Sequence, residues 1–400
     1  MPGFEMFGGL ERAEVQEVLD SGVLMRYGFD GMRKGHWKAI ELEQALAARM
    51  QTSYAHTVSS GTAALTVAMA SAGIGAGDEV IVPTFTFVAS FEAVLALGAI
   101  PVLADIDDTL ALEPNAVEKL INKRTKAVMP VHMCGSMANL KALKEICDNY
   151  GLALIEDACQ AIGGSFEGKP LGSYGDIGCF SFDFVKTITC GEGGGLITNS
   201  KDFYTNADHY SDHGHDHIGN DRGAETHPFL GYNYRISELH AAVGLAQIKR
   251  LDDFLAIQEK HYNILLASIA KLEGITLRRV PDGGVQNYSF LNFFLPTESK
   301  ARKAQKELVA AGVDACFYWY DNNWHYHTKW DHLKGVHSLG PVSEQVNKGI
   351  KQQGERNFAA SDQWMGRTVS CLIKLSWTEE EVAQRAATLQ RVLEKILREA

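Results

Sequence analysis

The sequence has few of the features that mark a nucleic-acid-binding, disulfide-bonded or zinc-binding protein. Its formal net charge is −11, and no run of Lys or Arg is longer than two residues. A nucleic-acid partner needs a concentrated basic surface, so that class of function is disfavoured. The seven cysteines are scattered without a C-x-x-C pair, which indicates neither a disulfide framework nor a cysteine-rich zinc site. We therefore expect a protein of the reducing cytoplasm.

Signals for export and for membrane insertion are also missing. The N-terminal MPGFEMFGGLERAEVQ contains acidic side chains and lacks the apolar core of a signal peptide. Residues 80–104 contain a single charged residue, Glu92, and could pass for a weak membrane span. Pro83 and Pro101, with β-rich segments at both ends, instead predict a strand, a helix and a second strand. We expect no contact with a membrane.

What the sequence does contain is an ordinary globular composition, with 46% hydrophobic and 22% charged residues in a chain of 400. Strand-like and helical segments alternate from residue 79 to residue 158, which predicts an α/β fold with a mainly parallel sheet between helices. We predict an irregular N-terminal arm over 1–35, a large α/β domain over 36–258 and a smaller α+β domain over 259–400.

Two helices are predicted in the C-terminal half of the chain. One long helix from Ser237 to about Glu259 leads out of the large domain, and a closing helix begins after Thr378. Thr378 and Glu381 form a capping-box pattern, which marks the start of that last helix. Between them we expect a helix at 302–311, a few strands and a loop-rich stretch.

The segment 179–199, CFSFDFVKTITCGEGGGLITN, places one lysine, Lys186, on a turn between two strand-like runs. Ser181 precedes this lysine by five residues, and a glycine-rich GEGGG follows it. A lysine amine condenses with an aldehyde to give a Schiff base, which is how aldehyde cofactors are carried on proteins. A lone lysine is more often a solvated surface residue, so the assignment depends on the rest of the chain.

Further motifs precede and follow this lysine. Ser60, Gly61 and Thr62 open a helix, where free N–H groups can bind a phosphate, although such residues are also ordinary helix caps. Asp157 ends an apolar strand at the edge of the sheet where ligands bind, although an aspartate there is often a cap or turn residue. Two further segments, PTFTFVAS before the lysine and GYNYRISELHAAVG after it, belong to the same series of motifs.

Taken together, SGT, TF, EDA, SF with Lys186 and GEGG, and GYNYR resemble the DegT/DnrJ-type sugar aminotransferases, which use pyridoxal 5′-phosphate (PLP) and have the aspartate-aminotransferase fold. The resemblance covers nearly the full length. It implies a fold-type I PLP transferase with a mixed, mostly parallel sheet, helices on both faces and a smaller C-terminal α+β domain. It also implies a homodimer with active sites at the interface.

The resemblance assigns Lys186 as the catalytic residue and implies roles for the matching positions. Asp157 is expected at the ring nitrogen of the cofactor, Phe87 on the ring face, and Asn233 at the phosphate of the partner subunit's cofactor. Phe87 could equally be a core aromatic, and Arg235 is an alternative to Asn233. The complete set of expected cofactor-binding residues is Ser60, Gly61, Thr62, Phe87, Asp157, Gln160, Ser181 and Asn233.

A relative in the family has His at the lysine position and performs dehydration, so the presence of Lys186 favours transamination. The implied reaction takes an amino group from glutamate and gives it to a keto or aldehydo sugar. One pocket then accepts two substrates in turn, with Lys186 moving the proton.

Four segments point to the acceptor: MCGSMANL, SFDFVKTITCGEGG, SDHGHDHIG and FYWYDNNWHY. They resemble the subgroup that makes 8-amino-3,8-dideoxy-manno-octulosonate (Kdo8N) for lipopolysaccharide, which implies an 8-oxo octulosonate acceptor. Candidates to hold its carboxylate are Arg26, Arg33, His215 and His325, and Trp319 and Tyr320 could stack on the sugar or simply pack. The role of the His-rich loop 209–217 stays open, and its irregular spacing gives no reason to expect a metal.

Two other functions compete with this interpretation. One is amination of a nucleotide-linked 4-keto-6-deoxy sugar, the reaction of most of the family. The other is a non-catalytic PLP-binding regulator, which is disfavoured because no DNA-binding motif accompanies the PLP motifs.

Overall fold

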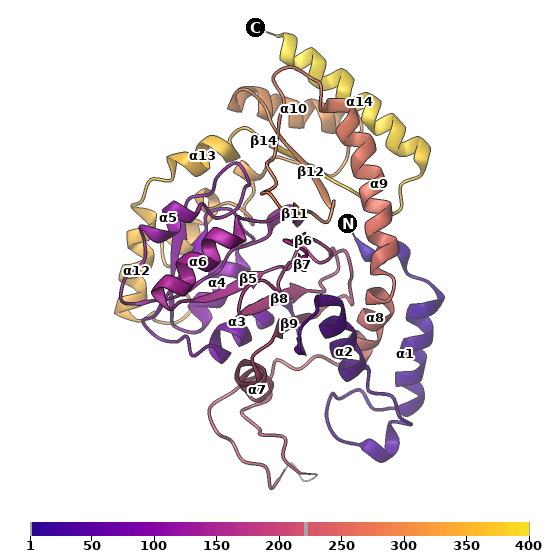
Figure 1. Ribbon diagram of the computed structural model, residues 1–400, viewed down its shortest axis with the longest axis vertical. Helices are drawn as coiled ribbons and strands as arrows, with labels where there is room; N and C mark the ends of the chain where they lie inside the picture. Colours follow the sequence, from indigo (N-terminus) through magenta and orange to yellow (C-terminus); the bar gives the residue numbers. More distant parts are fainter. Residues whose placement is uncertain (1, 220–222, 400) are drawn as a thin grey trace.

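The computed structural model describes residues 2–219 and 223–399 (Figure 1). Its centre is a seven-stranded sheet in the order β1-β9-β8-β5-β4-β2-β3. The neighbours from β8 to β3 are parallel, whereas β9 is antiparallel to both β8 and β1. The predicted mixed, mostly parallel sheet is therefore confirmed. Its strands are β1 (Tyr54–Val58), β2 (Glu79–Pro83), β3 (Ile100–Ala104), β4 (Thr125–Val128), β5 (Ala153–Asp157), β8 (Ile177–Ser181) and β9 (Gly194–Thr198).

Helices cover both faces of this sheet because successive strand residues point to opposite sides. In β9, Leu196 packs with α3, α4 and α7, whereas its neighbour Ile197 packs with α2 and α8. In β5, Leu154 lies on the side of α6 and Ile155 on the side of α3. These helices are α2 (Lys38–Met50), α3 (Gly61–Ser71), α4 (Ala89–Ala96), α5 (Pro114–Glu118), α6 (Leu140–Tyr150), α7 (Lys201–Tyr210) and α8 (Glu238–Ile248).

A second, antiparallel sheet lies toward the C-terminal end of the molecule, in the order β10-β12-β14-β13. Helix α9 extends from the large sheet into this part and packs with α14 (Figure 1). The predicted capping box of the last helix is confirmed, since Thr378 and Glu381 bond each other's backbone N–H groups. The elements are α9 (Leu251–Ile269), β10 (Thr276–Leu277), β12 (Phe290–Phe294), α10 (Glu298–Ala310), β13 (Cys316–Phe317), β14 (Thr368–Leu372) and α14 (Glu379–Arg398).

The remaining elements are short or peripheral. A three-stranded sheet joins β11 (Gly284–Val285), β6 (Ser165–Phe166) and β7 (Lys169–Pro170). The other helices are η1 (Gly3–Met6), α1 (Gly9–Ser21), η2 (Asp30–Met32), η3 (Met133–Gly135), η4 (Trp319–Asp321), η5 (His327–Lys329), α11 (Asp331–Lys334), α12 (Glu344–Gly354) and α13 (Ala359–Met365). No helix within the described residues is long and apolar enough to cross a membrane, and residues 80–104 form β2, α4 and β3 as predicted.

Three expectations about helices are corrected. The arm over 1–35 is not irregular, because α1 packs along α8, and Gly22 ends α1 in the left-handed conformation (φ +70°). The long helix from Ser237 is two helices, since Arg250 between them has non-helical dihedrals (φ −107°, ψ 4°). The stretch expected to be loop-rich contains α12, α13 and β14.

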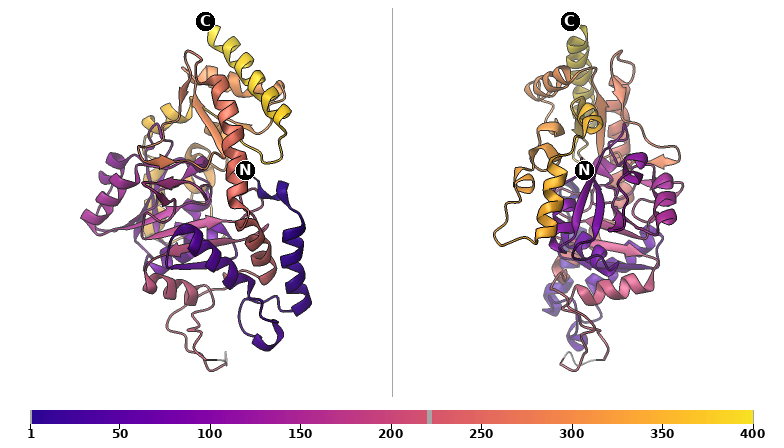
Figure 2. Two further views of the ribbon diagram at one scale, coloured as in Figure 1. Left: turned by 45° about the vertical axis from the view of Figure 1, so that its right-hand side comes forward. Right: turned by 90° about the vertical axis from the view of Figure 1, so that its left-hand side faces the viewer.

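Helix α12 lies against the edge strand β3 of the large sheet rather than on the small sheet (Figure 2). The approach is close, because a Cβ on Gly349 would lie 2.6 Å from Cγ2 of Ile100. Gln353 also accepts the backbone N–H of Leu103 (3.1 Å), which covers part of the exposed edge. We propose an arm over 1–35, a large domain over 36–258 and a small domain over 259–400. Helix α12 is then the part of the small domain that packs on the large sheet.

Candidate active site

A cavity of about 270 Å³ lies at the carboxyl ends of strands β2, β5 and β8. This is the sheet edge at which ligands bind in open α/β folds. The structure brings together nine of the residues predicted from the sequence. They are Ser60, Gly61, Thr62, Phe87, Asp157, Gln160, Ser181, Lys186 and His325.

The N-terminus of α3 forms one side of the cavity. Ser60 caps the helix by accepting the N–H of Ala63 (3.0 Å). Within the described chain, the N–H groups of Gly61 and Thr62 have no hydrogen-bond acceptor, so they are available to an anion. A Cβ on Gly61 would lie 2.7 Å from Cβ of Ser181, so glycine is needed for the helix to approach β8 this closely.

Lys186 lies on the loop between β8 and β9, where the sequence placed it. Its backbone N–H donates to the carbonyl of Asp183 (3.0 Å), and its own carbonyl accepts the N–H of Gly3 (2.9 Å). Phe4 stacks on Phe184 of the same loop, with ring centroids 4.2 Å apart. The start of the chain therefore holds the lysine loop in place, a contact that the sequence did not reveal.

Asp157 is buried at the base of the cavity and its orientation is fixed by hydrogen bonds. Ser90 on α4 donates to one carboxylate oxygen (2.7 Å), and the N–H of Cys159 donates to the other (3.1 Å). Thr86 in turn bonds the Ser90 hydroxyl (2.6 Å). Ser90 and Thr86 are site residues that sequence reasoning missed, because nothing local marks them as partners of an aspartate so far along the chain.

Phe87 and His325 form the opposite wall, with ring centroids 5.4 Å apart. Trp324 stacks on the outer side of Phe87 (5.8 Å). The two segments are joined by a backbone bond in which Thr86 N–H donates to the His325 carbonyl (3.0 Å). Burial and the nearby charge of Lys186 lower the pKa of His325 to about 3, so its imidazole is neutral and adds no positive charge. Its Nδ1 bonds the side-chain oxygen of Asn322 (2.8 Å), which leaves Nε2 for a ligand.

The structure does not bring the other acceptor candidates to this cavity. Arg26 is a correction: its guanidinium is buried and paired with Glu43 at 2.6 Å. Arg33 is likewise buried and ion-paired with Glu238 (3.3 Å). His215 pairs with Glu225 (2.8 Å), and Tyr320 packs against Tyr326 (5.3 Å).

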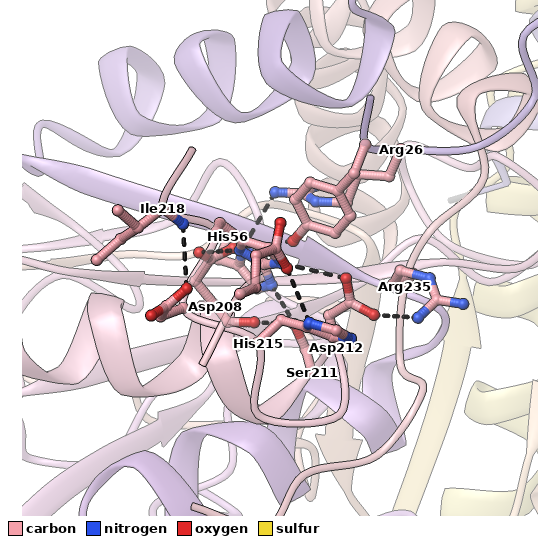
Figure 3. Close-up of polar contacts among 12 residues, drawn as sticks. Arg26, His56, Asp208, Ser211, Asp212, His215, Ile218 and Arg235 are labelled. Atoms are coloured by element: carbon pink, nitrogen blue, oxygen red, sulfur yellow. Dashed lines mark hydrogen bonds and ion pairs between the residues drawn. The ribbon is translucent and has the colours of Figure 1, made fainter. Parts of the chain in front are cut away.

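The His-rich loop is held by a network of charged and polar side chains (Figure 3). His217 contacts Asp208 (2.8 Å) and Asp212 (3.1 Å) through its two ring nitrogens. Asp212 also pairs with Arg235. Within the residues that the structure describes, no group of three His, Cys, Asp or Glu side chains is arranged to hold a metal ion. The loop is thus built around ion pairs.

Asn233 lies on the segment that this network supports, outside the cavity of its own chain. Its side chain is exposed and accepts the N–H of Arg235 (3.3 Å). Asn233 also forms an isolated antiparallel bridge with Asp212, which ties it to the His-rich loop. The cavity of one chain is therefore assembled without this residue.

A family model described as the DegT/DnrJ/EryC1/StrS aminotransferase family matches residues 8–390. The chain belongs to this family. It is an aminotransferase with the fold of the PLP transferases, and its cofactor is pyridoxal 5′-phosphate. Membership also decides against the non-catalytic regulator that the sequence alone left open.

Individual DegT/DnrJ/EryC1/StrS relatives match across most of the chain. GDP-perosamine synthase of Vibrio cholerae is 36% identical over 297 residues, 74% of this chain and 77% of that protein. 3-amino-5-hydroxybenzoate synthase of Amycolatopsis mediterranei is 33% identical over 322 residues, 78% of this chain and 80% of that protein. The solved aminotransferase of Psychrobacter cryohalolentis superposes with a TM-score of 0.85 at 26% identity and covers 98% of both chains.

The residues of the cavity fit the cofactor of this family. The free N–H groups of Gly61 and Thr62 suit its phosphate, and the buried carboxylate of Asp157 suits a protonated ring nitrogen. When bound, PLP supplies an electron sink for the bonds of the substrate carbon. Lys186 would supply the amine that holds the cofactor and moves a proton, and Phe87 would offer a ring face.

The His217 network carries a testable stability prediction. Burial alone would lower the pKa of His217, but hydrogen bonds with Asp208 and Asp212 outweigh it and raise the pKa to about 9. The folded pKa exceeds the unfolded value of about 6.5, so the stabilisation is complete below that pH and is lost as the pH rises through about 9. We expect His217→Asn to lower the free energy of unfolding by about 1–3 kcal/mol at pH 6.5, and by much less at pH 9.5.

Urea unfolding of both proteins at several pH values measures this difference. His36→Asn is the matched control, because His36 forms an exposed ion pair with Glu17 (3.1 Å) and its removal is expected to cost less than about 0.5 kcal/mol. A difference between wild type and His217→Asn that stays constant from pH 6.5 to 9.5 would show that the imidazolium is not the stabilising species.

Proposed function

We propose that this aminotransferase transfers the amino group of glutamate to C8 of 8-oxo-3,8-dideoxy-manno-octulosonate, giving Kdo8N for lipopolysaccharide. One observation carries the choice of acceptor. His325, from the segment FYWYDNNWHY that resembles the octulosonate subgroup, lines the cavity that contains Lys186. The acceptor sugar would therefore meet one of the four segments that carry this resemblance.

The residues of the cavity divide into two tasks in this proposal. Lys186 holds the cofactor and carries the proton between carbon atoms, while Asp157, fixed by Ser90, maintains the charge of the ring nitrogen. Neutral His325 is placed to hydrogen-bond the sugar. Glutamate and the acceptor enter in turn, because one pocket serves both halves of a ping-pong transamination.

A nucleotide-linked 4-keto-6-deoxy sugar is the second candidate acceptor. It is supported by the relatives named GDP-perosamine synthase, at 36% identity in Vibrio cholerae and 37% in Escherichia coli O157:H7. The two acceptors differ in chemistry, since the octulosonate carries a carboxylate and the nucleotide sugar carries a diphosphate and a base. Recognition of one therefore does not imply recognition of the other.

The choice is tested by giving the purified PLP-loaded enzyme glutamate with each acceptor separately and measuring the aminated product by mass spectrometry. We expect product from the 8-oxo octulosonate, with kcat/KM at least about 100-fold above that for GDP-4-keto-6-deoxymannose. Product from the nucleotide sugar alone would refute the proposed acceptor and leave the transaminase chemistry unchanged.

We further propose a homodimer in which Asn233 reaches the cofactor phosphate of the partner subunit. Apolar side chains are exposed beside the lysine loop, at Phe184 (50%) and Val185 (49%), and beside Asn233, at Leu230 (89%) and Tyr232 (57%). Apolar exposure of this extent around a functional site is typical of an interface. A dimer contact also gives a role to the Asn233 segment, which lies outside the cavity of its own chain.

Mixing two defective variants tests this arrangement. Lys186→Ala lacks the catalytic amine, and Asn233→Ala is expected to weaken PLP binding about tenfold. In a mixed dimer, one of the two sites has both residues intact. About half of the dimers are mixed after random pairing, so at limiting PLP the mixture should recover up to about a quarter of wild-type activity. The control variant is Asn347→Ala on α12, an asparagine-to-alanine change away from the proposed interface, which should leave PLP affinity and activity unchanged. If mixing restores no activity, or if light scattering shows an active monomer, Asn233 does not act across an interface.

A further inference from the structure

A second cavity lies between the edge strand β3 and the helices α11 and α12, and its volume is about 210 Å³. Its lining residues, all within the described chain, differ from those of the active site. An engineered apolar cavity of about 150 Å³ holds benzene, so this space is large enough for a six-membered ring with a small substituent. Its apolar lining consists of Phe91, Leu103, Trp330, Leu333 and Ile350.

Two ring nitrogens in the lining are buried without a hydrogen-bond partner among the described residues. One is Nε1 of Trp330, a side chain only 1% exposed, and the other is Nε2 of His327. Buried N–H groups in folded proteins are almost always paired, with protein, water or a ligand. Burial and the charge of Lys334 lower the pKa of His327 to about 4, so this ring is neutral and can present either a donor or an acceptor.

Arg356 places a positive charge at the same cavity. One guanidinium nitrogen donates to the carbonyl of Leu103 and to Gln353 (3.0 Å), while its Nε and Nη2 atoms have no partner within the described chain. No described carboxylate lies within 4 Å of it, since Asp105 acts on it only from farther away and accepts hydrogen bonds from Ser361 instead. Burial lowers the pKa of Arg356, so its charge is partly desolvated, and its guanidinium lies over the Phe358 ring (4.9 Å) without an ion-pair partner in the described chain.

We propose that this cavity binds a small carboxylate with a flat apolar body. Arg356 takes the carboxylate through its free N–H groups. The apolar body lies among Phe91, Leu333 and Ile350. A carboxylate suits the site because guanidinium binds it with two parallel hydrogen bonds, and because the apolar lining excludes a fully hydrated anion.

The cavity adjoins the active site along two segments, so binding there must be distinguished from binding at the catalytic centre. Phe91 follows Ser90, the partner of Asp157, and His327 lies two residues after His325. Both segments are held together by backbone bonds between 86–88 and 324–325. A ligand of this cavity therefore contacts the reverse side of the elements that form the wall of the active site.

The probe is sodium benzoate, titrated into the PLP-loaded enzyme by isothermal calorimetry, with benzamide as its uncharged counterpart. We expect saturable binding of benzoate that persists when glutamate is saturating, and binding of benzamide at least about tenfold weaker. Arg356→Gln is expected to weaken benzoate about tenfold or more, and Leu333→Trp to abolish its binding by filling the cavity. Arg391→Gln, an exposed arginine on α14, should change nothing.

Because Arg356 also bonds the edge strand, thermal unfolding and the visible cofactor absorption of each variant are measured first. Leu333→Trp leaves Arg356 in place, so it tests the cavity even if Arg356→Gln folds poorly. The proposal is overturned by any of three results. They are the absence of benzoate binding, equal affinity for benzamide, and benzoate binding that glutamate displaces and Leu333→Trp leaves unchanged.

Discussion

Replacing Lys186 by alanine is expected to lower kcat for transamination by about 10⁴-fold, the upper range for a positioned acid–base group, while the protein stays folded. Lys186 is the one lysine that lines the cavity within the described chain, and its loop is fixed by bonds to Asp183 and Gly3. In the proposed mechanism, removing this amine deletes both the covalent attachment of the cofactor and the group that moves the proton. The α3 N-terminus and Asp157 remain, so weak non-covalent PLP binding should persist.

Borohydride reduction of the PLP-loaded enzyme, followed by peptide mass spectrometry, measures the attachment directly. Wild type should carry the label on Lys186, and the alanine variant should carry none. Lys201→Ala, an exposed lysine at the start of α7, is the matched control and should retain both label and activity. Labelling of another lysine in wild type would mean that the catalytic residue has been misassigned.

Much of the large sheet could be predicted from the sequence because its signals are local. Apolar runs such as 79–83 and 153–157 are strands buried on both faces, and two of the intervening helices, α5 and α6, have side-chain caps. The arm was misjudged because its many glycines suggested a loop, whereas residues 9–21 between them are a helix that Gly22 ends. The contact of α12 with β3 depends on Gly349 meeting Ile100, a pairing over some 250 residues that no local pattern encodes.

In the candidate site, too, residues with a local signal could be predicted, and residues whose role depends on a distant partner could not. Lys186, Asp157 and Ser60 lie at ends of predicted elements, and the sheet necessarily brings those ends together. Arg26 was misassigned because a cation in a glycine-rich segment looks free until its partner is known, and that partner, Glu43 at 2.6 Å, comes from helix α2. Ser90 was missed for the complementary reason, since its importance lies entirely in a bond to a distant aspartate.

Asp157→Asn is expected to lower kcat by about 10²–10³-fold with little change in stability. The amide oxygen can still accept the N–H of Cys159, and the amide NH2 can donate to the hydroxyl oxygen of Ser90, so the fold around it is kept. It cannot supply the negative charge that keeps the ring nitrogen of the cofactor protonated, and without that charge the electron sink is weaker. Ser90→Ala should have a smaller effect, about tenfold or less, because it removes one hydrogen bond and leaves the carboxylate.

The neighbouring Glu156 offers a control of the same chemistry with the opposite expected outcome. Its buried carboxylate points to the other face of β5 and accepts the N–H groups of Gly172, Tyr174 and Gly175 together with His132. We expect Glu156→Gln to lower the melting temperature and to leave kcat within about threefold, since one charged acceptor of several N–H groups is lost far from the reacting atoms. Single-turnover reaction of each PLP-loaded variant with glutamate measures the loss of activity, and thermal unfolding of the same variant measures the loss of stability. Comparable loss of activity in both variants would show that Asp157 acts through stability rather than through the charge it presents to the cofactor.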